Sequence, residues 1–231
     1  MVVDFPDGGY RFIAAPGRPF SAGAAAAPGF GLTRVRLLRA APLAEGLAQV
    51  QRHLDQARRP AASVASFELR VPAPMTAEGF AEFNRGYVER LRALGVAAGE
   101  HMPAARTNVA PSGGAVAEPC LYAFTYTAPQ PGARAAFRIS GSTETVAGSP
   151  AARIASILDE LEARMAELGV AWRDATFVNL YAASELGEAL QAELSRRVPV
   201  LHGFTWYPSL PPVAGADFEI DTGAMATEIV V

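Results

Sequence analysis

The sequence contains no lysine, and all 20 of its basic residues are arginines. A chain without lysine cannot form a lysine Schiff base with a carbonyl substrate or with pyridoxal phosphate, and it cannot supply the lysine of a P-loop. The formal net charge of −3 also argues against a general binder of nucleic acids, which needs an excess of basic residues. We therefore expect no nucleic-acid partner and no lysine-dependent chemistry.

Cysteine and histidine are scarce as well. Cys120 is the single cysteine, so no internal disulfide can form, and we expect it to be a buried strand residue. The three histidines, His53, His101 and His202, do not cluster, and no CxxC, HxxxH or HxE spacing typical of zinc sites occurs. The GxGxxG and GxSxG motifs of nucleotide-binding and hydrolase sites are absent too. We expect neither a metal nor a cofactor.

Long apolar runs are also missing. No stretch approaches the roughly 20 residues of a transmembrane helix, and residues 1–10, which include Asp4 and Asp7, lack the basic-then-apolar pattern of a signal peptide. We therefore expect a cytoplasmic protein with no membrane partner.

What the sequence does have is a large apolar fraction arranged with clear periodicity. Hydrophobic residues make up 50% of the chain and charged residues 19%, which allows a sizeable core. The spacing predicts helices over 43–58, 76–94, 153–168 and 186–194, and strands over 63–71, 106–110, 121–127, 136–141, 176–182, 204–207 and 217–222. Thr76 is the expected N-cap of the second helix, and Gly169 ends the third. Arg34, Arg36 and Arg39 are expected on a solvated strand face.

Two segments of the first half resemble motifs of the Rid/YjgF family of enamine/imine deaminases. Residues 80–87 (FAEFNRGY) resemble the family's second-helix motif, with Asn84 at the place of its pocket asparagine. Residues 103–109 (PAARTNV) resemble the strand whose arginine, here Arg106, clamps the substrate carboxylate. The stretch that includes Tyr10 loosely resembles another pocket segment of the family.

The second half resembles the same module at other places. Residues 137–141 (FRISG) resemble the family strand that ends in Ser-Gly, here Ser140 and Gly141. Residues 218–221 (FEID) resemble its closing strand, in which Glu219 matches the glutamate that positions or activates water.

Each half keeps one of the two charged groups of the family site. At the family's spacing, the position that should carry the glutamate after Arg106 is Leu121, and the position that should carry the arginine before Glu219 is Phe204. The resemblance therefore implies one shared pocket, with Asn84 and Arg106 from the first half and with Ser140, Gly141 and Glu219 from the second.

The resemblance implies an α+β fold of two tandem Rid/YjgF-like (chorismate-mutase-like) modules, each a mixed β-sheet with two helices packed on one face. The modules would be residues 1–128 and 134–231, joined by a linker at 129–133, and the chains would assemble as homotrimers. Tandem proteins of this kind are similar to the 2-aminomuconate and 2-amino-5-chloromuconate deaminases of aromatic catabolism.

The implied roles follow from side-chain chemistry, and each has a structural alternative. An arginine fork pairs with a carboxylate through two hydrogen bonds, but Arg106 is otherwise a surface salt-bridge residue. Glu219 would deliver water if burial raised its pKa. Otherwise it is a half-exposed strand residue, and Asp221, on the same face, stands in for it.

Ser140 and Gly141 would bind a carboxylate or developing charge, or form a strand-end turn. Asn84 would orient the substrate or a loop, or lie on the helix surface, and Tyr10 would line the pocket.

The sequence thus predicts a cofactor-independent deaminase, a hydrolase acting on C–N bonds. It would convert a small carboxylate-bearing, 2-aminomuconate-like enamine/imine acid to a 2-oxo acid and ammonia. Two alternatives stay open: a chorismatase-like enzyme on the same frame, and a non-catalytic protein that binds a small metabolite.

Overall fold

A computed structural model describes residues 1–231 apart from 115, 143–147, 184–187 and 199–202. No helix of the described part is long and apolar enough to cross a membrane.

The first half of the chain alternates strands and helices, and its elements after the first strand lie at the predicted places. Its elements are β4 (Phe30–Pro42), α1 (Leu43–Ala57), β5 (Val64–Arg70), α2 (Ala77–Leu94), β6 (Ala105–Pro111) and β7 (Cys120–Pro129). Thr76 caps α2 as expected, because its hydroxyl accepts a hydrogen bond from the backbone N–H of Gly79 at 3.1 Å. Gly95 ends the helix with φ at +87°, a conformation that favours glycine.

The second half repeats this order of elements. It consists of β8 (Phe137–Ser142), α3 (Pro150–Glu167), β9 (Phe177–Ala182), α4 (Glu188–Arg197), β10 (Thr205–Leu210) and β11 (Phe218–Ala224). Ile157, Leu158 and Leu161 of α3 are buried against the sheet, which is the apolar stripe that predicted this helix. Gly169 lies just beyond the helix end with φ at +66°, as expected.

All the described strands belong to one twelve-stranded sheet, and the expected fold of two Rid-like modules is therefore wrong. The strand order is β1-β2-β3-β8-β11-β9-β10-β6-β5-β7-β4-β12. The physical reason is a direct link between the halves: β10 pairs antiparallel with β6, with Ser209 opposite Pro111 and Leu210 opposite Ala110. Backbone hydrogen bonds thus continue from one half into the other.

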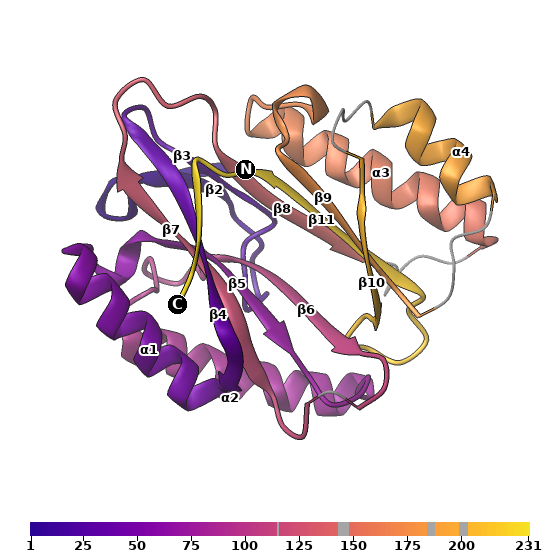
Figure 1. The fold of residues 1–231 in the computed structure, drawn as a ribbon, viewed down its shortest axis with the longest axis horizontal. Helices are drawn as coiled ribbons and strands as arrows, with labels where there is room; N and C mark the ends of the chain where they lie inside the picture. Colours follow the sequence, from indigo (N-terminus) through magenta and orange to yellow (C-terminus); the bar gives the residue numbers. More distant parts are fainter. Residues whose placement is uncertain (115, 143–147, 184–187, 199–202) are drawn as a thin grey trace.

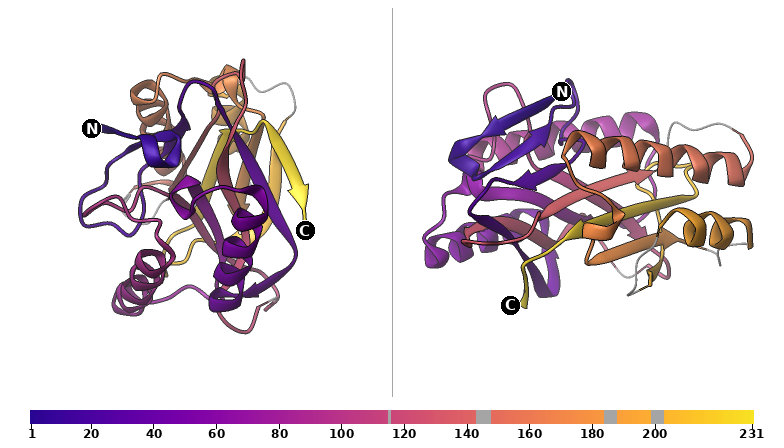
Figure 2. Two further views of the ribbon diagram at one scale, coloured as in Figure 1. Left: turned by 90° about the vertical axis from the view of Figure 1, so that its left-hand side faces the viewer. Right: turned by 90° about the horizontal axis from the view of Figure 1, so that it is seen from above.

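The two ends of the chain also cross between the halves. The N-terminal strands β1 (Val2–Phe5), β2 (Tyr10–Ile13) and β3 (Ala24–Ala26) extend the sheet beside β8 of the second half. The C-terminal strand β12 (Thr227–Val230) pairs in parallel with β4 of the first half. Figure 2 shows the two termini on opposite sides of the molecule. The predicted linker at 129–133 begins at the last residue of β7 and ends before β8, and the module boundaries stay a prediction.

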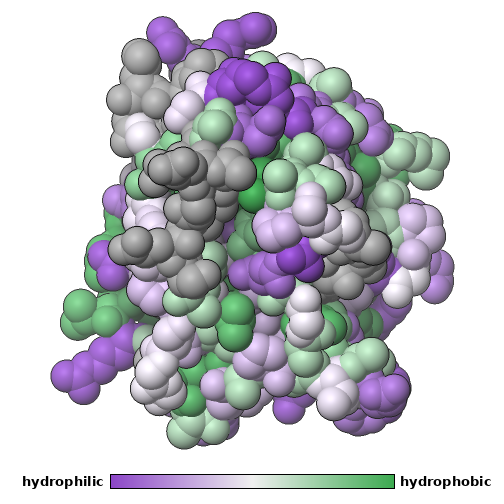
Figure 3. Space-filling model, turned by 90° about the vertical axis from the view of Figure 1, so that its right-hand side faces the viewer, coloured by the Kyte–Doolittle hydropathy of each residue, from purple (hydrophilic) through white to green (hydrophobic). Residues whose placement is uncertain are grey.

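The helices lie in two pairs on opposite sides of the strands (Figure 1). One apolar cluster lies between α1, α2 and the strands of the first half, and another between α3, α4 and those of the second. On the side of the molecule that carries α3, α4 and β10, the described hydrophilic and hydrophobic residues are interspersed (Figure 3). Because both helix pairs cover outer faces, the strands of the two halves meet in the middle of the molecule.

Candidate active site at the seam between the halves

A cavity lies where the two halves meet, and both contribute to its wall. From the first half come Arg18, Phe20, Phe80, Arg106 and Asn108; from the second come Ser140, Gly141, Ser142, Glu160, Arg164, Pro212 and Glu219. The structure therefore brings Arg106, Ser140, Gly141 and Glu219 to one cavity, although they are far apart in sequence. No partner chain is needed for this convergence.

Arg106 lies on the face of β6 that points toward α2. It is 5% exposed, which does not fit the alternative of a surface salt bridge. Its guanidinium carbon lies 4.5 Å from the ring centre of Phe20 and 5.0 Å from that of Tyr87, with Phe80 and Phe83 within 6 Å. Such rings attract the cation and keep water from it.

Asn84 holds this arginine rather than lining the cavity. The residue is half-buried on α2, and its Oδ1 accepts a hydrogen bond from Nη1 of Arg106 at 2.8 Å. The bond fixes one edge of the guanidinium, so Asn84 acts on the site through Arg106.

Ser140 and Gly141, together with Ser142, form the part of the wall that comes from β8. The Ser140 hydroxyl donates to the backbone carbonyl of Arg106 at 2.8 Å, so it links β8 to β6 across the seam. The Ser140 carbonyl in turn accepts from Nη1 of Arg164 on α3. A Cβ at Gly141 would lie 3.3 Å from the side chains of Ile157 and Leu161, so glycine lets β8 pack closely on α3.

Glu219 brings a carboxylate to the same cavity from β11. It is only 5% exposed, so the alternative of a half-exposed strand residue is wrong. In the sheet it lies between Ser142 of β8 and Tyr181 of β9, which are both central strands. Glu219 is thus held on rigid backbone within the wall that it shares with Arg106.

Asp221 does not replace Glu219, because other side chains already surround it. Its carboxylate accepts hydrogen bonds from the Thr107 hydroxyl at 2.8 Å, the Asn179 amide at 2.8 Å and the Tyr181 hydroxyl at 3.0 Å. It also forms an ion pair of 2.7 Å with Arg138. This residue ties β6, β8, β9 and β11 together beneath the site.

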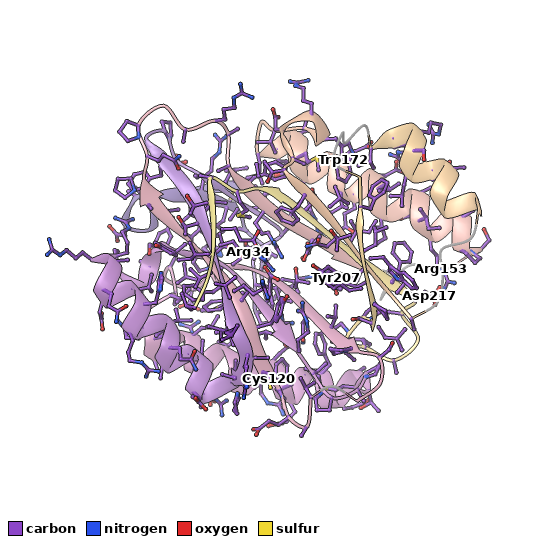
Figure 4. The ribbon with its side chains drawn as sticks, viewed as in Figure 1. Arg34, Cys120, Arg153, Trp172, Tyr207 and Asp217 are labelled. Carbon is purple, nitrogen blue, oxygen red and sulfur yellow. The ribbon has the colours of Figure 1, made fainter. Side chains whose placement is uncertain are left out.

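The buried network continues to Arg34, which lies in the middle of the molecule (Figure 4). Arg34 donates two hydrogen bonds to Glu68, of 2.7 and 2.8 Å, and it is 8% exposed. The expected solvated strand face is therefore wrong for this residue. Burial opposes the charge of Glu68, but Arg138 and Arg34 outweigh it and lower the pKa of Glu68 to about 2.

Tyr10 lies outside the cavity, and its expected pocket role does not fit. Its side chain is buried, and its hydroxyl donates to the backbone carbonyl of Val64 at 2.8 Å. Burial raises the pKa of this phenol well above its usual value. The residue belongs to the apolar cluster that anchors the N-terminal strands to the first half.

Sequence reasoning missed three notable cavity residues, Arg18, Asn108 and Arg164. Asn108 had a usable signal, because it follows Arg106 by two residues and therefore shares its face of the strand.

Arg164 is a helix residue whose pKa is lowered, first by burial and further by the nearby charge of Arg18, while Glu160 opposes the shift. Three arginines and two glutamates thus line one cavity, which leaves an excess of positive charge for an anionic ligand.

Among the described residues, no group of three or more His, Cys, Asp and Glu side chains could hold a metal ion. Cys120 is buried at the start of β7, as expected. Burial and the charge of Glu118 raise the pKa of its thiol, which disfavours the reactive thiolate.

Comparison with known proteins places the chain in a family. The family model described as 2-aminomuconate deaminase CnbZ matches residues 2–229. A 2-amino-5-chloromuconate deaminase from Comamonas testosteroni is 36% identical over 248 residues, which cover 99% of this chain and 98% of that protein.

Among solved structures, a chorismatase aligns with a TM-score of 0.52 and 12% identity, over 88% of this chain and 77% of that one. This likeness concerns the fold alone. A cyanuric acid hydrolase aligns with a TM-score of 0.34 and 13% identity, over 85% and 68%, which is too weak to carry an argument. On the match of nearly its whole length, the chain belongs to the 2-aminomuconate deaminase family.

Proposed function

We propose that this chain is a cofactor-independent deaminase that hydrolyses a 2-aminomuconate-like enamine/imine acid to a 2-oxo acid and ammonia. Membership of the deaminase family supports the reaction class. The observation that carries the proposal is that Arg106 of the first half and Glu219 of the second half line one cavity. A cation to hold the substrate and a carboxylate to act on it are thus available together.

Arg106 is the group proposed to bind the carboxylate next to the reacting carbon. Its planar fork matches a carboxylate, the aromatic rings around it limit competing water, and Asn84 fixes its orientation. A muconate skeleton carries a second carboxylate at its far end. Arg164 and Arg18 line the same cavity and are the proposed partners of that group.

The reaction needs one water molecule and no oxidant or reductant. A proton first moves from the enamine nitrogen to the carbon chain, which gives the imine. Glu219 then takes a proton from water as the water oxygen bonds to the imine carbon, and the C=N electron pair moves to nitrogen, which takes up that proton from Glu219. The hydroxyl proton of this carbinolamine then passes to the amino nitrogen, the C–N bond breaks as C=O forms, and ammonia leaves.

The test is ammonia release from a panel of 2-amino-dienoic acids. Removing the two-pronged contact in Arg106→Ala should lower kcat/KM by about a hundredfold or more, whereas Arg52→Ala, on the exposed face of α1, should not. Glu219→Gln should lower kcat by about 10²–10⁴-fold with little change in KM. Undiminished turnover in Arg106→Ala would contradict the assignment of the clamp.

The same panel of substrates distinguishes the proposed deaminase from its two alternatives, a chorismatase-like enzyme and a non-catalytic binding protein. The fold likeness to a chorismatase makes chorismate the substrate to include as a comparison. Turnover of chorismate without ammonia release from any amino acid of the panel would replace the deaminase proposal. Ligand binding without turnover of any compound would favour a non-catalytic binding protein.

A further inference from the structure

Asn108 has a buried side-chain amide for which the described residues supply no partner. The residue is 3% exposed, and neither its Oδ1 nor its Nδ2 forms a hydrogen bond with any residue that the structure describes. Buried polar groups in native proteins are nearly always hydrogen-bonded, and an exception calls for an explanation. An amide that lacks both its donor and its acceptor contacts destabilises the fold.

The position of Asn108 supplies that explanation, because the residue lines the cavity at the seam. Other described residues with unpartnered buried polar atoms are His53, Ser66, Thr125, Arg138 and Arg153, and none of them lines this cavity. The unmet hydrogen bonds of Asn108 thus belong to a residue of the cavity wall.

The spacing along β6 indicates which part of a ligand Asn108 would meet. Asn108 follows Arg106 by two residues, so both side chains project from the same face of the strand and their Cα atoms are roughly 7 Å apart. When Arg106 binds a carboxylate, the substituent on the adjacent carbon lies within reach of the side chain next along that face. An asparagine offers one acceptor and two donors there.

We propose that Asn108 is the residue that recognises the nitrogen-bearing carbon of the substrate, with Oδ1 accepting an N–H of the amino or imino group and Nδ2 donating to a substrate oxygen. The proposal rests on the proposed function for the identity of that substrate. It makes Asn108 the determinant that separates amino-bearing acids from acids of the same shape without nitrogen.

The test compares two saturated dicarboxylates, 2-aminoadipate and adipate, which differ in the amino group and cannot undergo imine hydrolysis. Calorimetry measures their binding to the wild type, to Asn108→Ala and to Thr125→Val, a matched control that removes a buried unpartnered hydroxyl outside the cavity. Asn108→Ala should weaken binding of 2-aminoadipate by about tenfold or more and change adipate binding by less than about twofold. Thr125→Val should change neither.

Thermal unfolding provides a readout that separates binding from structure. Since the amide has no hydrogen-bond partner among the described residues, Asn108→Ala should unfold at the same or a higher temperature than the wild type. An equal loss of affinity for both ligands, or no loss of affinity for either, would overturn the proposal. If alanine fails to fold, Asn108→Val, which fills the site and suits a strand, replaces it; failure of both variants to fold would also overturn the proposal.

These outcomes are distinguishable from a failure of the proposed function, because neither probe has to be turned over. A selective loss of 2-aminoadipate binding supports the role of Asn108 even if the natural reaction differs. Conversely, an unchanged preference for the amino compound in Asn108→Ala overturns this inference while leaving the Arg106 clamp untouched.

Discussion

Arg106 illustrates how the surroundings of one side chain decide what that side chain can do. An arginine in the same strand but exposed to water would exchange between partners, and its ion pairs would contribute little. Here four aromatic rings and the Asn84 amide fix the guanidinium at the cavity wall. The residue is thus oriented before a ligand arrives, which lowers the entropic cost of binding.

Arg18 allows a prediction about the far end of the substrate. It is exposed at the edge of the cavity and forms no ion pair with any residue of the described part of the chain. Because water screens an exposed charge, Arg18→Ala should raise KM for a dicarboxylate only about three- to tenfold and leave kcat unchanged. Steady-state kinetics with a matching monocarboxylate, whose KM should not change, provides the control. An equal rise in KM for both substrates would contradict the second-carboxylate role.

At the level of helices and strands, local patterns predicted more than long-range pairings. The apolar period and the Thr76 cap identified α2 within one residue of its observed start, because both signals lie within the element itself. The short strands β1, β2, β3 and β12 were not predicted. They have few residues and are stabilised by pairing with strands far away in sequence, for which neighbouring residues give no signal.

The same limit explains which residues of the site could be predicted from the sequence and which could not. Arg106 and Glu219 could be selected because the motifs around them are local. The burial of Arg34 could not, because its partner Glu68 lies on another strand and the pair depends on the packed sheet. Tyr10 was assigned to the pocket from a loose motif, and the structure shows it bonded to Val64 in the core.

The buried network between strands predicts how stability depends on pH. Glu68 has a pKa of about 2 in the folded protein, below the 4.5 of a free side chain. A carboxyl group with a lowered pKa contributes stability that is full above about pH 4.5 and is lost as the pH falls toward 2. The free energy of unfolding, measured with urea over this range, should therefore fall as the pH decreases.

Glu68→Gln isolates this contribution. At pH 7 the variant should be less stable by about 3–5 kcal/mol, because Arg34 and Arg138 lose their shared carboxylate within the core. As the pH falls through 4.5 toward 2, the difference from the wild type should shrink. A difference that stays constant over this range would show that Glu68 titrates at an ordinary pKa.

For the whole molecule, the main correction to the sequence analysis concerns how the halves are joined. The repeated order of elements is present in both halves, but β10 pairs with β6, β3 pairs with β8 and β12 pairs with β4, so that a single sheet results. The candidate site draws on both halves for its wall. Arg106 of the first half and Glu219 of the second thus belong to the same candidate site.

The most direct measurement is a crystal structure of Glu219→Gln with 2-aminomuconate bound, since loss of the carboxylate should slow turnover. We expect the ligand in the seam cavity, with one carboxylate on the Arg106 guanidinium and the nitrogen-bearing carbon beside residue 219. A ligand bound elsewhere, or one that contacts residues of only one half, would contradict a shared site.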